Sequence, residues 1–320
     1  MKRLVAFDYI RAISITGIIL CHFLYNYDST RSLAGWLGNT FNTIFVTMSA
    51  FLIGFKWEKE NREPLKFSFV VSRTKKLSYT YYPFLLFMFL FIYFIEQHTP
   101  TIKSATLHYG FCPILQRIPN WSHLWFISLI ILCYSSTYIY TKASKYIKIR
   151  AWGICMAGII SLTVVQLHNL SAILINVIVY ICLYVLIFGN TQSLMSFIQR
   201  QNSKIRTIII VLLVAICIIL VHDKSFNKSN LHGVLIGVFS AILLFILMFN
   251  FFSNKKASSF INFISEISFE IYLVHYIFTL SDYSIVNHIN NPFFAFTCII
   301  IVCILSGYCL KKLSLKKFIK

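Results

Sequence analysis

Long apolar segments, separated by short polar ones, recur along the whole chain. A helix of about 20 apolar residues crosses the hydrocarbon core of a bilayer. We predict ten membrane-spanning helices, near residues 7–26, 36–55, 77–95, 122–140, 151–166, 170–188, 204–221, 232–252, 263–281 and 291–310. The fifth and sixth are separated only by the short stretch 166–169. The pattern therefore predicts an all-α fold, a polytopic membrane bundle in which residues 1–320 form a single domain.

Composition supports this prediction. The 320 residues are 58% hydrophobic and only 12% charged, which is more apolar surface than a soluble domain can bury. The first span is too long for a cleavable signal peptide, and no small-residue cleavage site follows it. The nine cysteines are scattered without a paired metal-ligand spacing, so we expect no metal site.

The positive charge predicts how the chain is oriented. With the N-terminus in the cytoplasm, 23 of the 29 Lys and Arg residues fall on the cytoplasmic side and five on the outer side, and Arg11 lies within a span. This distribution follows the positive-inside rule, so we predict that both termini are cytoplasmic. No nucleic-acid-binding module accompanies the net charge of +19, and we expect no nucleic-acid partner.

The first span carries two ionisable residues on one face, Arg11 and His22. A step of eleven residues returns to within about 20° of the same helical direction and rises roughly 16 Å. Arg11 is thus predicted near the cytoplasmic end and His22 near the outer end. Ionisable groups inside a bilayer are costly, which indicates a lined pathway or site. The alternative is that each side chain extends to the nearest headgroup layer.

Two further groups of polar residues lie at opposite membrane surfaces. Arg73 and Lys76 precede the third span on the cytoplasmic side, where basic residues often only anchor a helix. Together with Arg11 they can instead converge on an anion, because Arg suits bidentate phosphate contacts and Lys acts as a point charge. His123 opens the fourth span between Trp121 and Trp125, which also fit an aromatic interface belt.

The ninth span carries a polar stripe. At 100° per residue, five side chains fall within about 60° of Ser268: Ser265, Tyr272, His275, Thr279 and Asp282. Such a stripe faces protein or water rather than lipid. Hydrogen bonds between helices would explain it equally well. Glu270 lies on the opposite face and needs a partner that the sequence does not identify.

Five stretches, in order along residues 7–278, resemble the acyltransferase 3 family of integral membrane acyltransferases. Arg11 and His22 match its Arg-x10-His signature, and residues 44–53 match its second-span pattern with Ala50 in place of Gly. Arg73 and Lys76 match its Arg-x-x-Arg motif with Lys in place of the second Arg. The two remaining stretches are His123-Leu124-Trp125 and residues 268–275.

The resemblance implies a bacterial plasma-membrane O-acyltransferase. Many family members O-acetylate surface glycans, so the implied donor is cytoplasmic acyl-CoA, usually acetyl-CoA, and the acceptor is a sugar hydroxyl of a surface polysaccharide or its lipid-linked precursor. Arg11, Arg73 and Lys76 would bind the phosphates of coenzyme A, and His22 would act as general base. Tyr272, His275 and His123 would orient the acceptor or stabilise the oxyanion.

Several alternatives stay open at this point. An acyl group covalently bound to His22 is a variant of the mechanism. A glycan exporter or flippase could line its pathway with the same residues, although inverted repeats and broken half-helices typical of transporters are not apparent. A non-catalytic sensing or scaffold bundle is the third class. The acceptor sugar, its hydroxyl position, the length of the acyl group and the oligomeric state are not indicated by the sequence.

Overall fold

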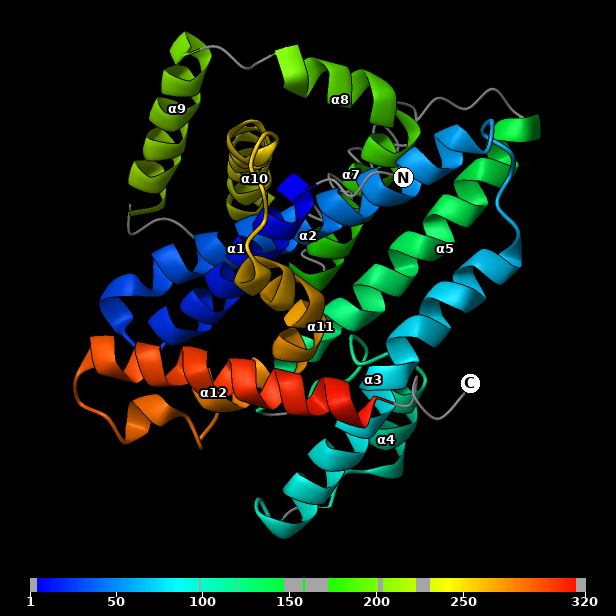
Figure 1. Cartoon of the computed structure of the whole chain (residues 1–320). Coiled ribbons are helices and arrows are strands. Elements are labelled where there is room, and N and C mark those ends of the chain that lie inside the picture. Colours follow the sequence, from blue (N-terminus) through cyan, green and yellow to red (C-terminus); the bar gives the residue numbers. More distant parts are fainter. Residues whose placement is uncertain are drawn as a thin grey trace. The chain divides into compact units, whose positions relative to one another are not determined.

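A computed structural model describes residues 5–97, 99–118, 120–146, 158, 172–200, 204–222 and 231–314. These residues form helices and connecting turns, and no strand occurs among them (Figure 1). The all-α prediction is therefore confirmed for this part of the chain. The helices are α1 (Val5–Leu24), α2 (Arg31–Lys59), α3 (Phe67–Phe94), α4 (Ile102–Tyr109), α5 (Trp125–Tyr146), α7 (Ala172–Gly189), α8 (Thr191–Arg200), α9 (Lys204–His222), α10 (Leu231–Phe252), α11 (Ser259–Thr279) and α12 (Pro292–Leu313), with short 3-10 turns at Asp28–Thr30, Ser122–Leu124 and Ile285–Asn287.

Six helices in the described ranges are long and apolar enough to cross a membrane. They are α1, α2 with its preceding turn, α3, α5 with its preceding turn, α10 and α12. The bent pair of α7 and α8, with an angle of 84° between its helices, would make a seventh. The chain is thus a multi-pass membrane protein.

The remaining predicted spans are not confirmed. The fifth, at 151–166, lies outside the described residues apart from residue 158. The seventh corresponds to α9, whose apolar part, Thr207–Val221, is shorter than a full span. The ninth corresponds to α11, whose serines, two glutamates and histidine lower its hydropathy. The count of ten and the cytoplasmic location of both termini therefore stay predictions.

The chain divides into two compact units, which are described separately. Unit 1 comprises residues 1–65 and 139–265, and unit 2 comprises residues 66–138 and 266–320. Two helices, α5 and α11, contribute residues to both units.

In unit 1, α2 is the central helix and contacts α1, α7 and α10. Small and hydroxylated residues make these contacts close, as is typical of helices packed in a membrane. The Trp36 Nε1–H donates to Ser240 Oγ at 2.8 Å. A Cβ at Gly237 would lie 2.5 Å from Asn39 Cβ, so only glycine allows α10 to approach α2 this closely.

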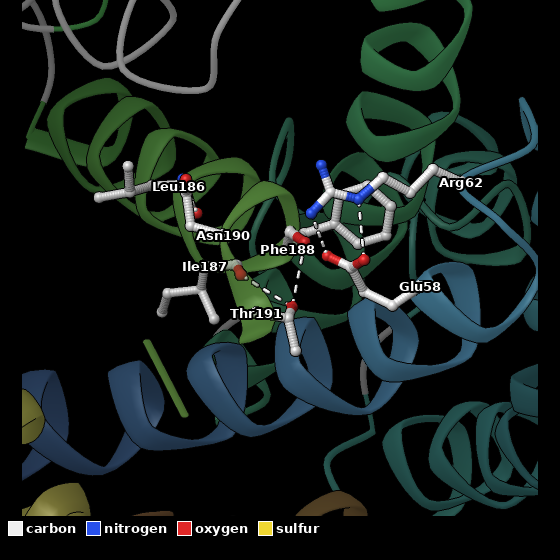
Figure 2. A network of polar contacts seen from close by, with 7 residues as sticks. All are labelled: Glu58, Arg62, Leu186, Ile187, Phe188, Asn190 and Thr191. Carbon is white, nitrogen blue, oxygen red and sulfur yellow. Dashed lines mark hydrogen bonds and ion pairs between the residues drawn. The ribbon is translucent and has the colours of Figure 1, made fainter. Parts of the chain in front are cut away.

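Two separate groups of polar contacts lie where the end of α2 passes the bend between α7 and α8 (Figure 2). Arg62 donates to both carboxylate oxygens of Glu58, at 2.8 and 2.6 Å. These bonds raise the pKa of the Arg62 guanidinium above its ordinary value. Thr191 donates to the carbonyls of Ile187 and Phe188 at the bend. A Cβ at Gly54 of α2 would lie only 1.9 Å from Thr191 Oγ1, so α2 passes directly beside this bend.

In unit 2, α3 contacts α4 and α12, and its aromatic side chains form much of the packing. Trp121 lies against Phe84 and Phe91 of α3, with ring centroids 5.8 and 6.0 Å apart, and is 1% exposed. This burial does not fit the aromatic-belt interpretation of Trp121, because a belt residue faces the membrane interface.

Pro83 interrupts the hydrogen-bond ladder within α3, since proline has no backbone N–H to donate to the carbonyl of Tyr79. The hydroxyl of Ser314, just after α12, donates to that carbonyl at 3.3 Å. A side chain 235 positions away in the sequence thus satisfies the carbonyl that the proline leaves without its helical partner.

Candidate functional site

Arg11 and Asp8 of α1 meet in a small polar network in unit 1. Arg11 Nη1 donates to Ser265 Oγ at 3.3 Å, and the Ser265 hydroxyl donates to Asp8 Oδ1 at 2.9 Å. Asp8 and Ser265 are buried, at 6% and 2% exposure, and Arg11 is half-buried. The guanidinium therefore contacts protein, which argues against the interpretation that Arg11 only extends to the headgroups.

His22 lies in the last turn of the same helix and is half-buried. Its backbone carbonyl accepts a hydrogen bond from the Asn26 side-chain amide at 3.2 Å. Its ring centroid lies 6.4 Å from that of Tyr25. Because α1 is continuous from Val5 to Leu24, Arg11 and His22 keep the predicted common face and the separation of roughly 16 Å.

The three other predicted catalytic residues form one cluster in unit 2. His123, Tyr272 and His275 are 4%, 6% and 0% exposed. The His123 ring centroid lies 5.6 Å from that of Tyr272 and 5.1 Å from that of His275. The structure thus brings together three residues that the sequence pointed out on two separate segments, and their catalytic role stays a prediction.

Main-chain groups hold this cluster in place. The Tyr272 hydroxyl donates to the His123 carbonyl. His123 Nε2 lies 3.1 Å from the Leu273 carbonyl, and His275 Nδ1 lies 2.7 Å from the Tyr272 carbonyl. Since a carbonyl oxygen only accepts, each of these two ring nitrogens carries a proton here. The contacts support the interpretation that the stripe on α11 joins helices by hydrogen bonds.

Arg73 and Lys76 both lie in the first half of α3, in unit 2. Arg73 is half-buried, with its guanidinium carbon 5.5 Å from the Phe69 ring centroid, and Lys76 is exposed. Arg11 belongs to unit 1, so the convergence of all three cations stays a prediction.

Glu270 has the partner that the sequence did not identify. It is 7% exposed, and its Oε1 lies 3.4 Å from the hydroxyl of Thr80 on α3. That hydroxyl also lies 3.3 Å from Ser314 Oγ. Hydroxyl groups from α3 and the end of α12 thus face a buried carboxyl group on α11.

His108 of α4 is a buried histidine that sequence reasoning passed over. Its Nδ1–H donates to the Ser104 carbonyl at 2.8 Å, and its Nε2 has no hydrogen-bond partner among the described residues. Burial lowers the pKa of His108 below its usual value, because the charged imidazolium loses more hydration than the neutral ring.

No group of three or more His, Cys, Asp or Glu side chains in the described ranges could hold a metal ion. The site residues described above include instead a cation beside a hydroxyl group, Arg11 with Ser265, and two histidines beside tyrosine and main-chain carbonyls. Side chains of these types are able to bind anions, exchange protons and position hydroxyl groups.

A family model described as an acyltransferase domain matches residues 4–312, nearly the whole chain. The chain belongs to the acyltransferase 3 family. The resemblance based on five short motifs is therefore confirmed, and the chain is a membrane acyltransferase. No curated protein and no solved structure matches the sequence of this acyltransferase.

Sequence reasoning on this acyltransferase missed two contacts in the structure. It placed Ser265 on the polar stripe without connecting it to Asp8, and it did not single out the pair formed by Glu58 and Arg62. The spacing of four residues in that pair was a usable signal, because side chains four apart on a helix are neighbours. The link between Asp8 and Ser265 had no local signal, since 257 positions separate them.

Proposed function

We propose that this acyltransferase moves an acetyl group from cytoplasmic acetyl-CoA to a sugar hydroxyl of a bacterial surface polysaccharide or of its lipid-linked precursor. The supporting observation is the single helix α1, which bears a cation held through Ser265 at one end and a half-buried imidazole at the other. Family membership supplies the reaction class.

In this proposal Arg11 binds a phosphate of the donor, with Arg73 and Lys76 adding further positive charge. A guanidinium offers several N–H donors to phosphate oxygens. The bond to Ser265 uses one Nη atom and orients the group. The flexible pantetheine arm then covers the distance of roughly 16 Å to His22.

His22 acts as general base in the chemical step. A ring nitrogen removes the proton from the acceptor hydroxyl as its oxygen attacks the thioester carbonyl. The new C–O bond forms, the C–S bond breaks, and the thiolate of coenzyme A takes the proton from the imidazolium. Direct transfer of this kind needs no acyl group on His22.

His123, Tyr272 and His275 have a positioning role in this proposal. Their burial and their bonds to main-chain carbonyls favour holding the 3-10 turn before α5 against α11 over direct contact with a substrate. The cluster would then influence the orientation of the acceptor and the stabilisation of the oxyanion only indirectly.

The proposal is tested by comparing surface glycan from cells that carry the protein, the His22→Ala variant or neither. We expect O-acetyl signals in the NMR spectrum only with the unmodified protein, since loss of a general base slows a reaction about 10²–10⁴-fold. His288→Ala is the matched control, because His288 is exposed and lies outside α1. Unchanged O-acetylation with His22→Ala would refute the assigned base, and glycan free of O-acetyl groups in all cells would refute the proposed acceptor.

A further inference from the structure

A pocket of about 330 Å³ opens in unit 1 beside the first turn of α1. Its volume lies in the range of small-molecule sites. Four polar residues line it, two from the ends of α8 and α10 and two from the turn after α10: Gln199, Asn250, Ser253 and Asn254. Ala6 and Phe249 supply apolar surface. None of the residues assigned above to catalysis or phosphate binding lines this pocket.

The lining is polar but uncharged. Three carboxamides and one hydroxyl offer both hydrogen-bond donors and acceptors, and no carboxylate or cation is among the lining residues. Phe249 is buried and presents an apolar surface. A flat ring with donors and acceptors along its edge, such as a nucleobase, complements this combination.

The end of α10 and the turn after it form one wall of the pocket, and contacts with α1 hold this wall. The Tyr9 ring stacks on Phe252 with centroids 4.1 Å apart and an angle of 6°. The Tyr9 hydroxyl donates to the Lys256 carbonyl at 3.0 Å, and Ser253 Oγ donates to the Asn250 carbonyl at 3.1 Å. The turn that carries Asn254 is therefore fixed on both sides, so the pocket is preformed.

Cations adjoin the pocket in sequence. Arg200 directly follows Gln199, and Lys255 and Lys256 directly follow Asn254. All three belong to segments that the charge distribution places on the cytoplasmic side. An uncharged, amide-lined pocket whose lining segments continue directly into basic residues suits a ligand that joins a neutral ring to phosphates, which is the chemistry of a nucleotide.

We propose that this pocket binds the adenine ring of the acyl-CoA donor, with Gln199, Asn250 and Asn254 hydrogen-bonding to its edge. This inference rests on the proposed function, which supplies the donor. Arg11 lies five residues beyond Ala6 on α1, a rise of roughly 7.5 Å and a turn of about 140° about the helix axis. The donor would therefore bend around α1 between its base and the phosphate that contacts Arg11. One helix thus carries the base-binding end, the phosphate-binding cation and, further along, His22.

The test uses the purified full-length protein with two donors, acetyl-CoA and acetyl-pantetheine, which lacks the nucleotide. The double variant Gln199→Ala/Asn254→Ala should raise the KM for acetyl-CoA about 10- to 100-fold, since each hydrogen bond contributes a factor of about 3 to 10. The kcat, and the KM for acetyl-pantetheine, should not change. Gln192→Ala is the control, because Gln192 is an exposed residue of the same helix that does not line the pocket.

A competitor gives an independent readout. Adenosine 3′,5′-bisphosphate, the nucleotide end of coenzyme A, should inhibit the unmodified protein with acetyl-CoA and inhibit the double variant at least tenfold more weakly. An unchanged KM for acetyl-CoA in the double variant, or an equal rise for both donors, would overturn the pocket assignment and leave the proposed function intact. If the unmodified protein transferred acetyl from neither donor, the proposed function and this inference would both fail.

Discussion

In unit 1 the buried carboxylates lie close to cations, whereas in unit 2 the buried ionisable side chains described above meet neutral partners. Arg11 and Asp8 are bridged by Ser265, and Glu58 is paired with Arg62. In unit 2, by contrast, Tyr272 and His123 bond to main-chain carbonyls, and the buried Glu270 faces the hydroxyl of Thr80.

This difference separates two kinds of task. A half-buried cation keeps its charge and can exchange a protein contact for a ligand phosphate, so unit 1 suits binding of an anionic donor. Neutral groups bonded to the main chain lose little by burial and keep a fixed geometry, so unit 2 suits positioning. Salt should distinguish the two units, since it screens accessible charges and leaves buried neutral hydrogen bonds almost unaffected.

The largest effect is expected from Arg11→Met. Loss of a charged hydrogen-bond donor to phosphate should raise the KM for acetyl-CoA about 10- to 100-fold and change kcat little. Arg11→Lys should raise this KM less than Arg11→Met does, because lysine keeps the positive charge. Steady-state kinetics at low and high salt measure both variants. A fall in kcat at unchanged KM would assign Arg11 to the chemical step and remove the distinction between its role and that of His22.

Arg62→Met should lower the free energy of unfolding by about 1–2 kcal/mol. The Glu58 carboxylate, with only 7% of its side chain exposed, would lose two charge-assisted hydrogen bonds. Thermal or denaturant unfolding in detergent measures the change. In the double variant Arg62→Met/Glu58→Gln, the free energy of unfolding should fall by less than the sum of the two single-variant decreases. Both substitutions remove the same ion pair. Additive decreases, or a decrease for Arg62→Met that does not change with salt concentration, would contradict the charged character of the Arg62–Glu58 pair.

Tyr272→Phe should lower the free energy of unfolding by about 1 kcal/mol, independently of salt, because it removes one neutral hydrogen bond. If the cluster in unit 2 positions helices, kcat should fall less than about tenfold, far less than with His22→Ala. Unfolding in detergent measures the change in stability, and steady-state kinetics measure the change in kcat. A loss of rate comparable to that of His22→Ala would place Tyr272 among the catalytic residues.

The smallest effect is expected from the titration of His108. Burial lowers its pKa in the folded state, so the unfolded chain binds more protons below the usual histidine pKa of about 6.5. The contribution of neutral His108 is therefore fully present above about pH 6.5 and is lost as the pH falls. His108→Asn should reduce the decline of Tm between pH 7.5 and 5.5. An identical decline in both proteins would exclude His108 as its source.

Much of the helical framework could be predicted because its signal is local. The apolar stretches at 7–26 and 36–55 are long enough to span a bilayer by themselves, and α1 and α2 occupy them. The predicted span is not confirmed for α11, where the polar residues that form the stripe also lower the hydropathy of the segment. The site residues of α11 were recognised through the same polarity, because a stripe on one helical face needs polar neighbours.

The partners of those residues could not be predicted. Glu270 was recognised as a buried charge in need of a contact, but Thr80 lies 190 positions away and Ser314 follows another helix. Ser265 meets Asp8 across 257 positions. None of these three hydroxyl groups has a property that distinguishes it in the sequence from the many other Ser and Thr residues of the chain.

The sequence by itself determined the apolar spans, the uneven distribution of positive charge, the common face of Arg11 and His22, and the motifs of an acyltransferase. Each depends on residues within one helix or on a sum over the chain. Tertiary structure decided which side chains meet: Ser265 with Arg11, Tyr272 with His123, and four polar residues around the pocket beside α1. These contacts depend on how helices pack against one another, and helix packing brings together residues that the order of the chain keeps far apart.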